Sequence, residues 1–495
     1  MNEYIKLAWR NIWRNKRRTL ITAASIFFAM FFAVIMRSFQ LGSYTSMINS
    51  VVESYSGHLQ IQQKDYFKSP NINNSMAFNT DLQNTIEAND EIVSYDARLQ
   101  SGLLASSGHS SKIGIVFGVN PKKANELTKV AEKIINIHVS EQAIERLKKT
   151  DISEDEKSDF EQIIDKIEEL EGKYFTNFED LNYELKLKGK KIKQFSEIIE
   201  DCLKFEGEYL SQNDNNVIIG YRLADFLNLQ IGDSIIVMGQ GYHGANAAGK
   251  YRIKGFLKFP SLEFNNTAIY MTLRNAQNLF EAYQIADNGV DTTFYVNFVA
   301  LNTNEKISLK SSSEKRIKDV IAELETSIND DNLSVIFWKK SNKALVQQIE
   351  SDNVSGQMMI FILYLIIGFG VFGTVLMMVA ERKRELGVMI AIGMKKIKLA
   401  IVVTLEMIFI GLLGVTAGGI ASAPIIFVGH FYPIRLTGEM AEVMEQFNIE
   451  PIMPMEIFDT YFFNQGFTVL IIVLFAMIYP IFKILRMNVI NAIRS

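Results

Sequence analysis

Four segments are long and apolar enough to cross a lipid bilayer, and they restrict the fold of this chain more than any other feature. They cover residues 19–36, 358–380, 399–428 and 467–485. A membrane-spanning helix needs roughly 20 apolar residues, with a range of about 17–25. The first segment is longer than the apolar core of a signal peptide, which has about 7–15 residues. We therefore expect four transmembrane helices, the first of them retained as an anchor.

The distribution of Lys and Arg predicts which parts of the chain face the cytoplasm. Residues 1–18 carry six basic side chains and one acid, and residues 381–398 again carry six basic side chains. The loop 429–466 is acidic, and the tail 486–495 is basic. Because short loops rich in Lys and Arg stay in the cytoplasm, we expect both termini and residues 381–398 to be cytoplasmic. Residues 37–357 and the loop 429–466 then lie outside the membrane.

The long segment between the first two spans reads as a folded domain. Strand-like stretches at 58–62, 92–99 and 112–119 alternate with helix candidates, and residues 217–240 read as a strand, a helix, a turn and a second strand. Further strands are expected at 251–256, 267–271, 294–301 and 333–338. Such alternation is typical of a compact mixed domain. The predicted fold class is therefore an α-helical membrane protein with a large α/β (α+β) extracytoplasmic domain inserted between the first and second transmembrane helices. Helical periodicity at its two edges predicts stalk helices.

Residues 1–18 and residues 121–213 each have a distinct pattern of apolar and charged side chains. Residues 1–18 alternate apolar and basic side chains at helical spacing, which predicts an amphipathic elbow helix lying at the lipid headgroups. Residues 121–213 combine apolar stripes with dense Glu, Asp and Lys, which predicts a charged helical insert. The charges of such an insert are usually its solvated face; a docking surface for an outer partner is the alternative.

Neither the composition of the chain nor its short motifs indicate an enzyme. The net charge of −4 gives no basic footprint for nucleic acid, and Cys202 is the only cysteine, so neither an internal disulfide nor a cysteine zinc cluster can form. The five histidines show no metal spacing. Residues 244–251 imitate a phosphate-binding loop, but Tyr251 stands where a small hydroxyl is needed and the run joins two strands, so we expect a hairpin loop there. We predict no catalytic residue, no metal and no bound cofactor.

The apolar segments contain one acid and several glycines of interest. Glu406 lies near the cytoplasmic end of the third span; it is a functional candidate, and its alternatives are a place at the interface or a bond to a neighbouring helix. Glycines allow helices to approach closely, within one subunit or across a dimer. The glycines singled out as a membrane packing face are Gly373, Gly411, Gly414 and Gly418.

The loop 381–398 contains the most specific sequence motif in the chain. Between its two basic clusters lies an apolar, small-residue segment. This segment suits the docking of a partner, because its apolar face would otherwise be exposed to water. The loop resembles the coupling segment of FtsX-type ABC permeases, which include the MacB and LolC/LolE families and belong to the type VII ABC superfamily. The pattern E-R-x-x-E-[IL]-G-x-x-x-A-[IL]-G is filled by Glu381, Arg382, Glu385, Leu386, Gly387, Ala391, Ile392 and Gly393.

The resemblance extends to other parts of the chain. The run from Val217 to Asp233 and Trp338 resemble the MacB-like extracytoplasmic domain, and the close at 488–494 resembles the end of the family's last span. The resemblance implies a non-catalytic permease subunit that works by mechanotransmission, paired with a second permease subunit as a homodimer or a homologous heterodimer. It also implies a separate cytosolic ABC ATPase dimer, which would bind the ATP and Mg, and a multi-pass location in the cell inner membrane.

Three functions remain open at this point. The first is release of lipoproteins from the inner membrane, favoured by the LolE-like wording of residues 57–61. The second is MacB-like efflux of peptides or drugs, with a periplasmic carrier or an outer-membrane partner. The third is an FtsX-like regulator of a cell-wall hydrolase that transports no substrate. The large outer domain favours the first two.

Overall fold

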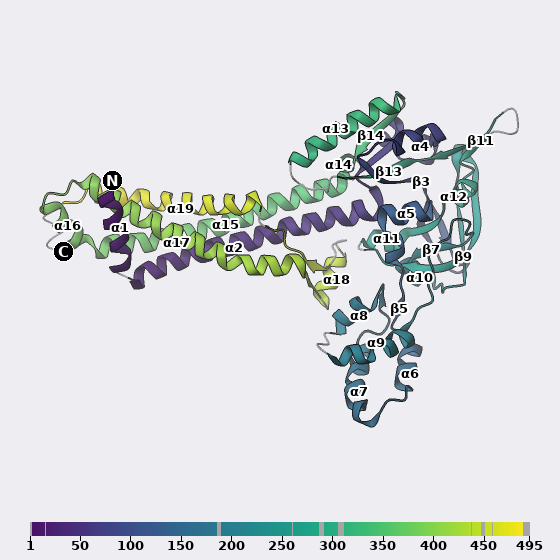
Figure 1. Ribbon diagram of the computed structural model, residues 1–495, viewed down its shortest axis with the longest axis horizontal. Coiled ribbons are helices and arrows are strands. Elements are labelled where there is room, and N and C mark those ends of the chain that lie inside the picture. Colours follow the sequence, from purple (N-terminus) through teal and green to yellow (C-terminus); the bar gives the residue numbers. More distant parts are fainter. Residues whose placement is uncertain are drawn as a thin grey trace. The chain divides into compact units, whose positions relative to one another are not determined.

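The fold was analysed in a computed structural model, which describes residues 2–14, 16–185, 190–259, 261–286, 292–304, 311–436, 438–446, 451–457 and 459–488. The chain divides into two compact units (Figure 1). The helical unit comprises Met1–Ser46, Ala344–Leu436 and Ile452–Ser495, and the sheet unit comprises Met47–Lys343 and Thr437–Pro451. Most of the family-like close at 488–494 lies outside the described residues.

Long helices make up the helical unit. Its elements are α1 (Asn2–Arg14), α2 (Lys16–Val51), α15 (Lys343–Glu381), α16 (Lys383–Ala391), α17 (Lys396–Phe431), β15 (Ile434–Arg435), β16 (Ile452–Met453) and α19 (Thr460–Leu485). Of these, α2 from Thr19, α15, α17 and α19 are long and apolar enough to cross a membrane. The four expected spans are thus present as helices, and α2 and α15 continue as single helices through the stretches predicted as stalks.

Glycines let α17 pack closely against its neighbours. A Cβ atom added to Gly414 would lie 2.7 Å from Ile26 Cβ, and one added to Gly418 would lie 2.6 Å from the carbonyl oxygen of Phe27. These two glycines therefore pack against α2 within the same subunit. Gly411 faces α19, where its added Cβ would lie 3.3 Å from Leu470 Cδ2. Gly373, on α15, has no described atom within 4 Å of its added Cβ.

The sheet unit is a mixed domain, as the sequence predicts. Its strands are β1 (Leu59–Gln63), β2 (Met76–Ala77), β3 (Ile92–Ser106), β4 (Ser111–Val119), β5 (Ile137–His138), β6 (Tyr174–Phe175), β7 (Val217–Gly220), β8 (Ser234–Gln240), β9 (Asn246–Leu257), β10 (Ala268–Thr272), β11 (Tyr283–Ile285), β12 (Thr292–Val296), β13 (Phe298–Thr303) and β14 (Leu333–Phe337). Its helices are α3 (Lys64–Lys68), α4 (Thr80–Glu87), α5 (Pro121–Thr128), α6 (Glu141–Lys148), α7 (Glu154–Glu168), α8 (Phe178–Leu185), α9 (Lys190–Leu203), α10 (Tyr221–Leu227), α11 (Leu262–Thr267), α12 (Leu273–Leu279), α13 (Ser311–Ile328), α14 (Trp338–Ser341) and α18 (Glu439–Gln446).

A long strand, β3, joins two parts of the main sheet. The strand order is β14-β1-β13-β3-β4-β10-β7-β9-β8, and β3 also pairs with β8. The first half of β3 pairs with β13. Its second half pairs with β4, and its last residues pair also with β8, so β3, β4, β10, β7, β9 and β8 close on themselves. Apolar side chains of these strands, together with residues of α10 and α12, form one buried cluster. Closure hides the strand edges that would otherwise be free to pair with other chains.

The chain enters and leaves the sheet through neighbouring strands. A π-helical turn (Val52–Ser56) precedes β1, and α14 follows β14. The two strands are antiparallel, with Leu59 opposite Phe337, so the start of β1 lies beside the end of β14. Gly57 makes the turn into β1 with φ 64° and ψ −179°, a conformation that side chains rarely adopt.

Two local predictions are wrong. The apolar run 294–301 is two strands, because it breaks at the buried Asn297, whose side chain accepts a bond from the backbone of Gln100 and donates to Ser75 Oγ at 3.1 Å. The hairpin loop expected at 244–251 is shorter than predicted. Gly249 and Lys250 already pair with β8 within β9, and only residues 241–245 connect the strands.

The charged insert contains its own hydrophobic core. Helices α6 to α9 pack around a buried cluster that includes Leu147, Phe160, Ile167 and Leu181 (Figure 1). Two short strands, β5 and β6, pair within it and were not predicted. The dense charges of this segment surround a folded core, which is the arrangement expected of a solvated helical insert.

Candidate functional site

The segment between α15 and α17 forms a short amphipathic helix, α16. Arg382 is its N-cap, and Gly393 ends it with φ 106°, a backbone conformation that favours glycine. The amide of Met394 donates to the carbonyl of Met389 at 3.1 Å, so the last turn is closed by a glycine-type cap. The small residue at position 393 is thus required by the backbone of the loop itself.

One face of this segment is buried in the helical unit. Leu386 and Gly387 are buried, and Leu386 belongs to the cluster that α1, α2, α15, α17 and α19 share. The Arg382 side chain is buried as well, with an exposed fraction of 6% for the residue. Three of the eight pattern residues therefore point inward, where they can hold α16 against the spans but offer little surface to a partner.

The opposite face is open. Val388 and Ile392 are 41% and 82% exposed and lie four residues apart, so both face the same side at the end of the helix. Glu381, Glu385 and Ala391 are exposed around them, as is Gly393. An apolar pair in a charged surround is an arrangement that marks protein interaction sites. Val388 fills one of the variable positions of the pattern, so sequence reasoning missed it.

Polar side chains connect α16 to α1 and α17. The Asn11 Nδ2 amide donates to Glu406 Oε1 at 2.6 Å, and Arg382 Nη1 donates to Glu406 Oε2 at 2.5 Å. Arg382 Nε also donates to Glu385 Oε2 at 3.4 Å, and Arg14 forms an ion pair with that same oxygen. Asn11 and Arg14 are both on α1, so the five side chains form a continuous series of polar contacts that begins and ends on α1. We call it the coupling ring.

Of the places considered for Glu406, the structure has the one in which its side chain bonds to a neighbouring helix. Its residue is 2% exposed, and it bonds to two neighbouring segments instead of facing solvent at the interface. Its partner Asn11 lies 395 residues away along the chain, so no local pattern could have found it. Arg14 was counted only as one of the basic residues of the elbow. The packing of α1 on α17 also brings Trp9 against Phe409, with ring centroids 5.7 Å apart.

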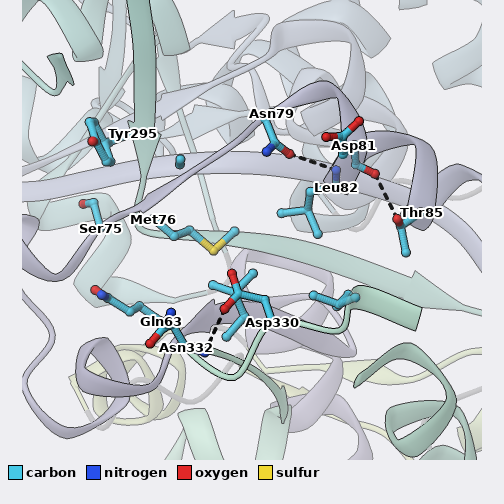
Figure 2. A pocket seen from close by; sticks show the side chains of 13 residues that line it. Gln63, Ser75, Met76, Asn79, Asp81, Leu82, Thr85, Tyr295, Asp330 and Asn332 are labelled. Carbon is cyan, nitrogen blue, oxygen red and sulfur yellow. Dashed lines mark hydrogen bonds between the residues drawn. The ribbon is translucent and has the colours of Figure 1, made fainter. Parts of the chain in front are cut away.

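Elsewhere the described residues offer no metal site: no three His, Cys, Asp or Glu side chains gather there. A pocket of about 350 Å³ lies in the sheet unit (Figure 2). Two of its lining side chains bond within the protein: Asn79 Oδ1 accepts from the Leu82 amide and Asp330 Oδ1 accepts from the Asn332 amide, both at 2.9 Å.

Comparisons with known proteins agree with this geometry. Residues 357–489 match the family described as FtsX-like permease C-terminal. An uncharacterized ABC transporter permease of Methanocaldococcus jannaschii, MJ1507, is 24% identical over 234 residues, which are 45% of this chain and 51% of the relative. The chain thus spans about half the length of that curated relative. Residues 357–489, which the family description matches, contain α16, Arg382 and Glu406.

Two solved structures also match at 10% identity. The periplasmic region of MacB from Actinobacillus actinomycetemcomitans has a TM-score of 0.28 and covers 59% of this chain and 92% of its own. The extracellular domain of YknZ, a noncanonic ABC-type transporter from Gram-positive bacteria, has a TM-score of 0.26 and covers 56% of this chain and 98% of its own. Residues 357–489 thus resemble the C-terminal part of FtsX-like permeases, and the relative that matches this chain is an ABC transporter permease.

Proposed function

We propose that this chain is the non-catalytic permease subunit of an ABC system in which a separate cytosolic ATPase dimer docks on α16. The observation that carries this proposal is the open apolar pair Val388 and Ile392 on a helix that lies between two candidate spans. The helix is flanked by basic residues, which favours a cytoplasmic position. ATP and Mg would be bound by the partner and not by this chain.

The proposed work is mechanotransmission from the ATPase to the outer domain. Within the helical unit, two hydrogen bonds join the C-terminal half of α2 to α15. Arg37 Nη1 donates to Asn353 Oδ1 at 2.8 Å, and the Tyr44 hydroxyl donates to Asp352 Oδ2 at 2.7 Å. Bonds of this kind let two helices move as one lever. Within the sheet unit, the continuations of these helices meet adjacent strands, β1 and β14. Both features support transmission along a helix pair.

We further propose that the outer domain releases acylated lipoproteins from the inner membrane. The LolE-like wording of residues 57–61 supports this substrate class, and the size of the sheet unit supports transport over regulation of a hydrolase. Two permease subunits would form the membrane part, with both termini of each in the cytoplasm. Efflux with a periplasmic adaptor and control of a cell-wall hydrolase are the outcomes that would replace this substrate class.

The test is mass spectrometry of what co-purifies with the intact chain from native membranes, with and without a non-hydrolysable ATP analogue. Release predicts an ABC ATPase together with acylated lipoproteins. The same ATPase with an adaptor and an outer-membrane channel would assign efflux, and a cell-wall hydrolase would assign regulation. Recovery of no ATPase under either condition would contradict the whole proposal.

Variants test the docking surface in the same experiment. Ile392→Asp and Val388→Asp place a charge on the open face of α16 and should abolish co-purification of the ATPase. Ile434→Asp is the matched control, because Ile434 is also exposed, at 54%, and lies in the segment assigned to the other side of the membrane. Full ATPase recovery with Ile392→Asp would place the docking surface elsewhere.

A further inference from the structure

We infer that Arg382 is a positioning residue that acts inward through Glu406 and is not a contact for the partner ATPase. The inference rests on the proposed function, because it assigns how the docked helix transmits movement. The pattern that contains Arg382 invites the opposite interpretation, since its neighbours Glu381 and Glu385 are exposed. Burial of the guanidinium and its bond to a buried carboxylate on α17 decide between the two.

Each oxygen of Glu406 serves a different segment. Oε1 accepts from Asn11 on α1, and Oε2 accepts from Arg382 at the start of α16. A buried carboxylate depends on such partners, because burial removes the water that would otherwise stabilise its charge. The start of α16 therefore cannot shift relative to α17 without separating a buried pair of opposite charges. That requirement couples the positions of α16 and α17.

The remaining bonds of the coupling ring lead back to α1. Arg382 reaches Glu385, and Glu385 is held by Arg14, which lies one helical turn from Asn11. The ion pair of Arg14 with Glu385 is about half exposed on both sides, so it adds little to stability. Glu385 nevertheless lies at the border between the ring and the open face. We assign binding to the open face of α16 and transmission to the ring beneath it.

Removing one charge of the pair separates these two roles. In Arg382→Met and Glu406→Gln, the ATPase recovered with the wild-type chain should still bind, with affinity changed by no more than about threefold. Stimulation of ATP hydrolysis per bound complex should fall by about tenfold, within the usual range of coupling between sites. Arg384→Met is the matched control, because it removes an exposed cation two residues away and should keep the stimulation.

A double variant distinguishes positioning from a merely structural role. Replacing both charges, as in Arg382→Met with Glu406→Met, leaves no unpaired buried charge and should restore thermal stability. Stimulation should nevertheless remain low, because the bond between α16 and α17 is absent. If the double variant recovers stimulation together with stability, the pair serves folding alone and the inference is wrong.

A partner-independent measurement keeps this inference separate from the proposed function. Hydrogen exchange of the α16 amides, measured on the intact chain in lipid nanodiscs, should be faster in Arg382→Met by about tenfold, corresponding to a loss of local stability near 1.4 kcal/mol. Arg384→Met should leave it unchanged. Loss of ATPase binding by Arg382→Met as complete as that by Ile392→Asp would make Arg382 a docking residue and overturn the inference. Retained binding by Ile392→Asp would instead overturn the proposed function and leave the exchange result standing.

Discussion

The backbone amide of Trp338 donates to the carbonyl oxygen of His58 at 3.1 Å, which fastens the point where the chain leaves the sheet to the point where it enters. His58 lies directly before β1, and Trp338 begins α14 directly after β14. The Trp338 side chain is buried, and the His58 imidazole contacts Thr303 Oγ1 of β13 at 2.9 Å. The residue before β1 is therefore held against the residue after β14. We call this pair of residues the sheet joint.

Substitution of Gly57, which precedes the sheet joint, should destabilise the fold. A Cβ atom there would lie 2.9 Å from the carbonyl oxygen of Leu301, and φ is +64°. We expect Gly57→Ala to lower the free energy of unfolding by about 1–3 kcal/mol, the usual cost of such backbone strain. Urea unfolding of the intact chain, followed by Trp338 fluorescence in a Trp9→Phe, Trp13→Phe background, would measure it.

The control for Gly57 is Gly108. It also has a positive φ, +94°, but no described atom lies within 4 Å of its added Cβ. Gly108→Ala should therefore lack the steric part of the cost and destabilise less than Gly57→Ala. Equal effects of the two substitutions would mean that the contact with Leu301 does not matter.

The membrane part of the fold could be predicted because its signals are local. A run of apolar residues identifies a span wherever its neighbours lie, and the α16 pattern lies within one short loop. The burial of Arg382 could not be found this way. In the sequence it is one of three consecutive basic residues, and only the helix geometry and the bond to Glu406 give it an inward direction.

The sheet unit shows the same limit on a larger scale. Each strand of the closed sheet has a local apolar pattern, but its closure depends on β3 pairing with both β4 and β8. Residues such as Leu104 and Met238, which face each other across that closure, are far apart in the chain. The break at Asn297 was missed for a related reason, since its partners Gln100 and Ser75 come from distant segments.

Gly414 and Gly418 should be far less tolerant of substitution than Gly373. Gly414→Ala would bring Cβ to 2.9 Å from the carbonyl oxygen of Ala23, and Gly418→Ala to 2.6 Å from that of Phe27. Because a backbone oxygen cannot rotate away, we expect overpacking to cost about 1–3 kcal/mol for each. The thermal unfolding of the purified chain in mild detergent would report it. Gly373→Ala, with open space in the single chain, should leave the unfolding temperature unchanged; a loss there would reveal a contact with another subunit.

The buried pair of Asp96 and Arg98 should dominate the stability of the sheet unit. Arg98 Nε donates to Asp96 Oδ2 at 3.0 Å, and both side chains are buried. Burial raises the pKa of the Asp96 carboxyl to about 6, and Arg98 opposes that rise. Removing the cation in Arg98→Met leaves a buried carboxylate unpaired, which typically costs about 3–5 kcal/mol. Urea unfolding at pH 8 would measure it.

The pH dependence of Arg98→Met follows from the sign of that pKa change. Without Arg98 the pKa of Asp96 should rise further, so the folded state holds a proton that the unfolded state has lost. Stability linked to a raised carboxyl pKa is present below the unfolded value and is lost as pH rises through the folded value. Arg98→Met should therefore be less destabilised at pH 5 than at pH 8. Equal destabilisation at both values would show that water reaches the carboxylate.

His58 should make the sheet joint weaker in acid. Burial lowers the pKa of its imidazole to about 4 from its ordinary value of 6.5, and its Nδ1 lies 3.1 Å from the Thr303 amide, which donates to it. As pH falls from 6.5 to 4, the unfolded chain takes up a proton that folded His58 refuses, so stability present above pH 6.5 is lost across this window. The loss amounts to at most about 3 kcal/mol.

In His58→Asn, which keeps an acceptor for Thr303, urea unfolding followed by Trp338 fluorescence should show a correspondingly smaller loss of stability between pH 7 and pH 4. The exposed His109 is the control, and His109→Asn should follow the wild-type pH profile. An unchanged profile in His58→Asn would mean that the imidazole is protonated inside the fold, and the joint would then need an acidic partner for it.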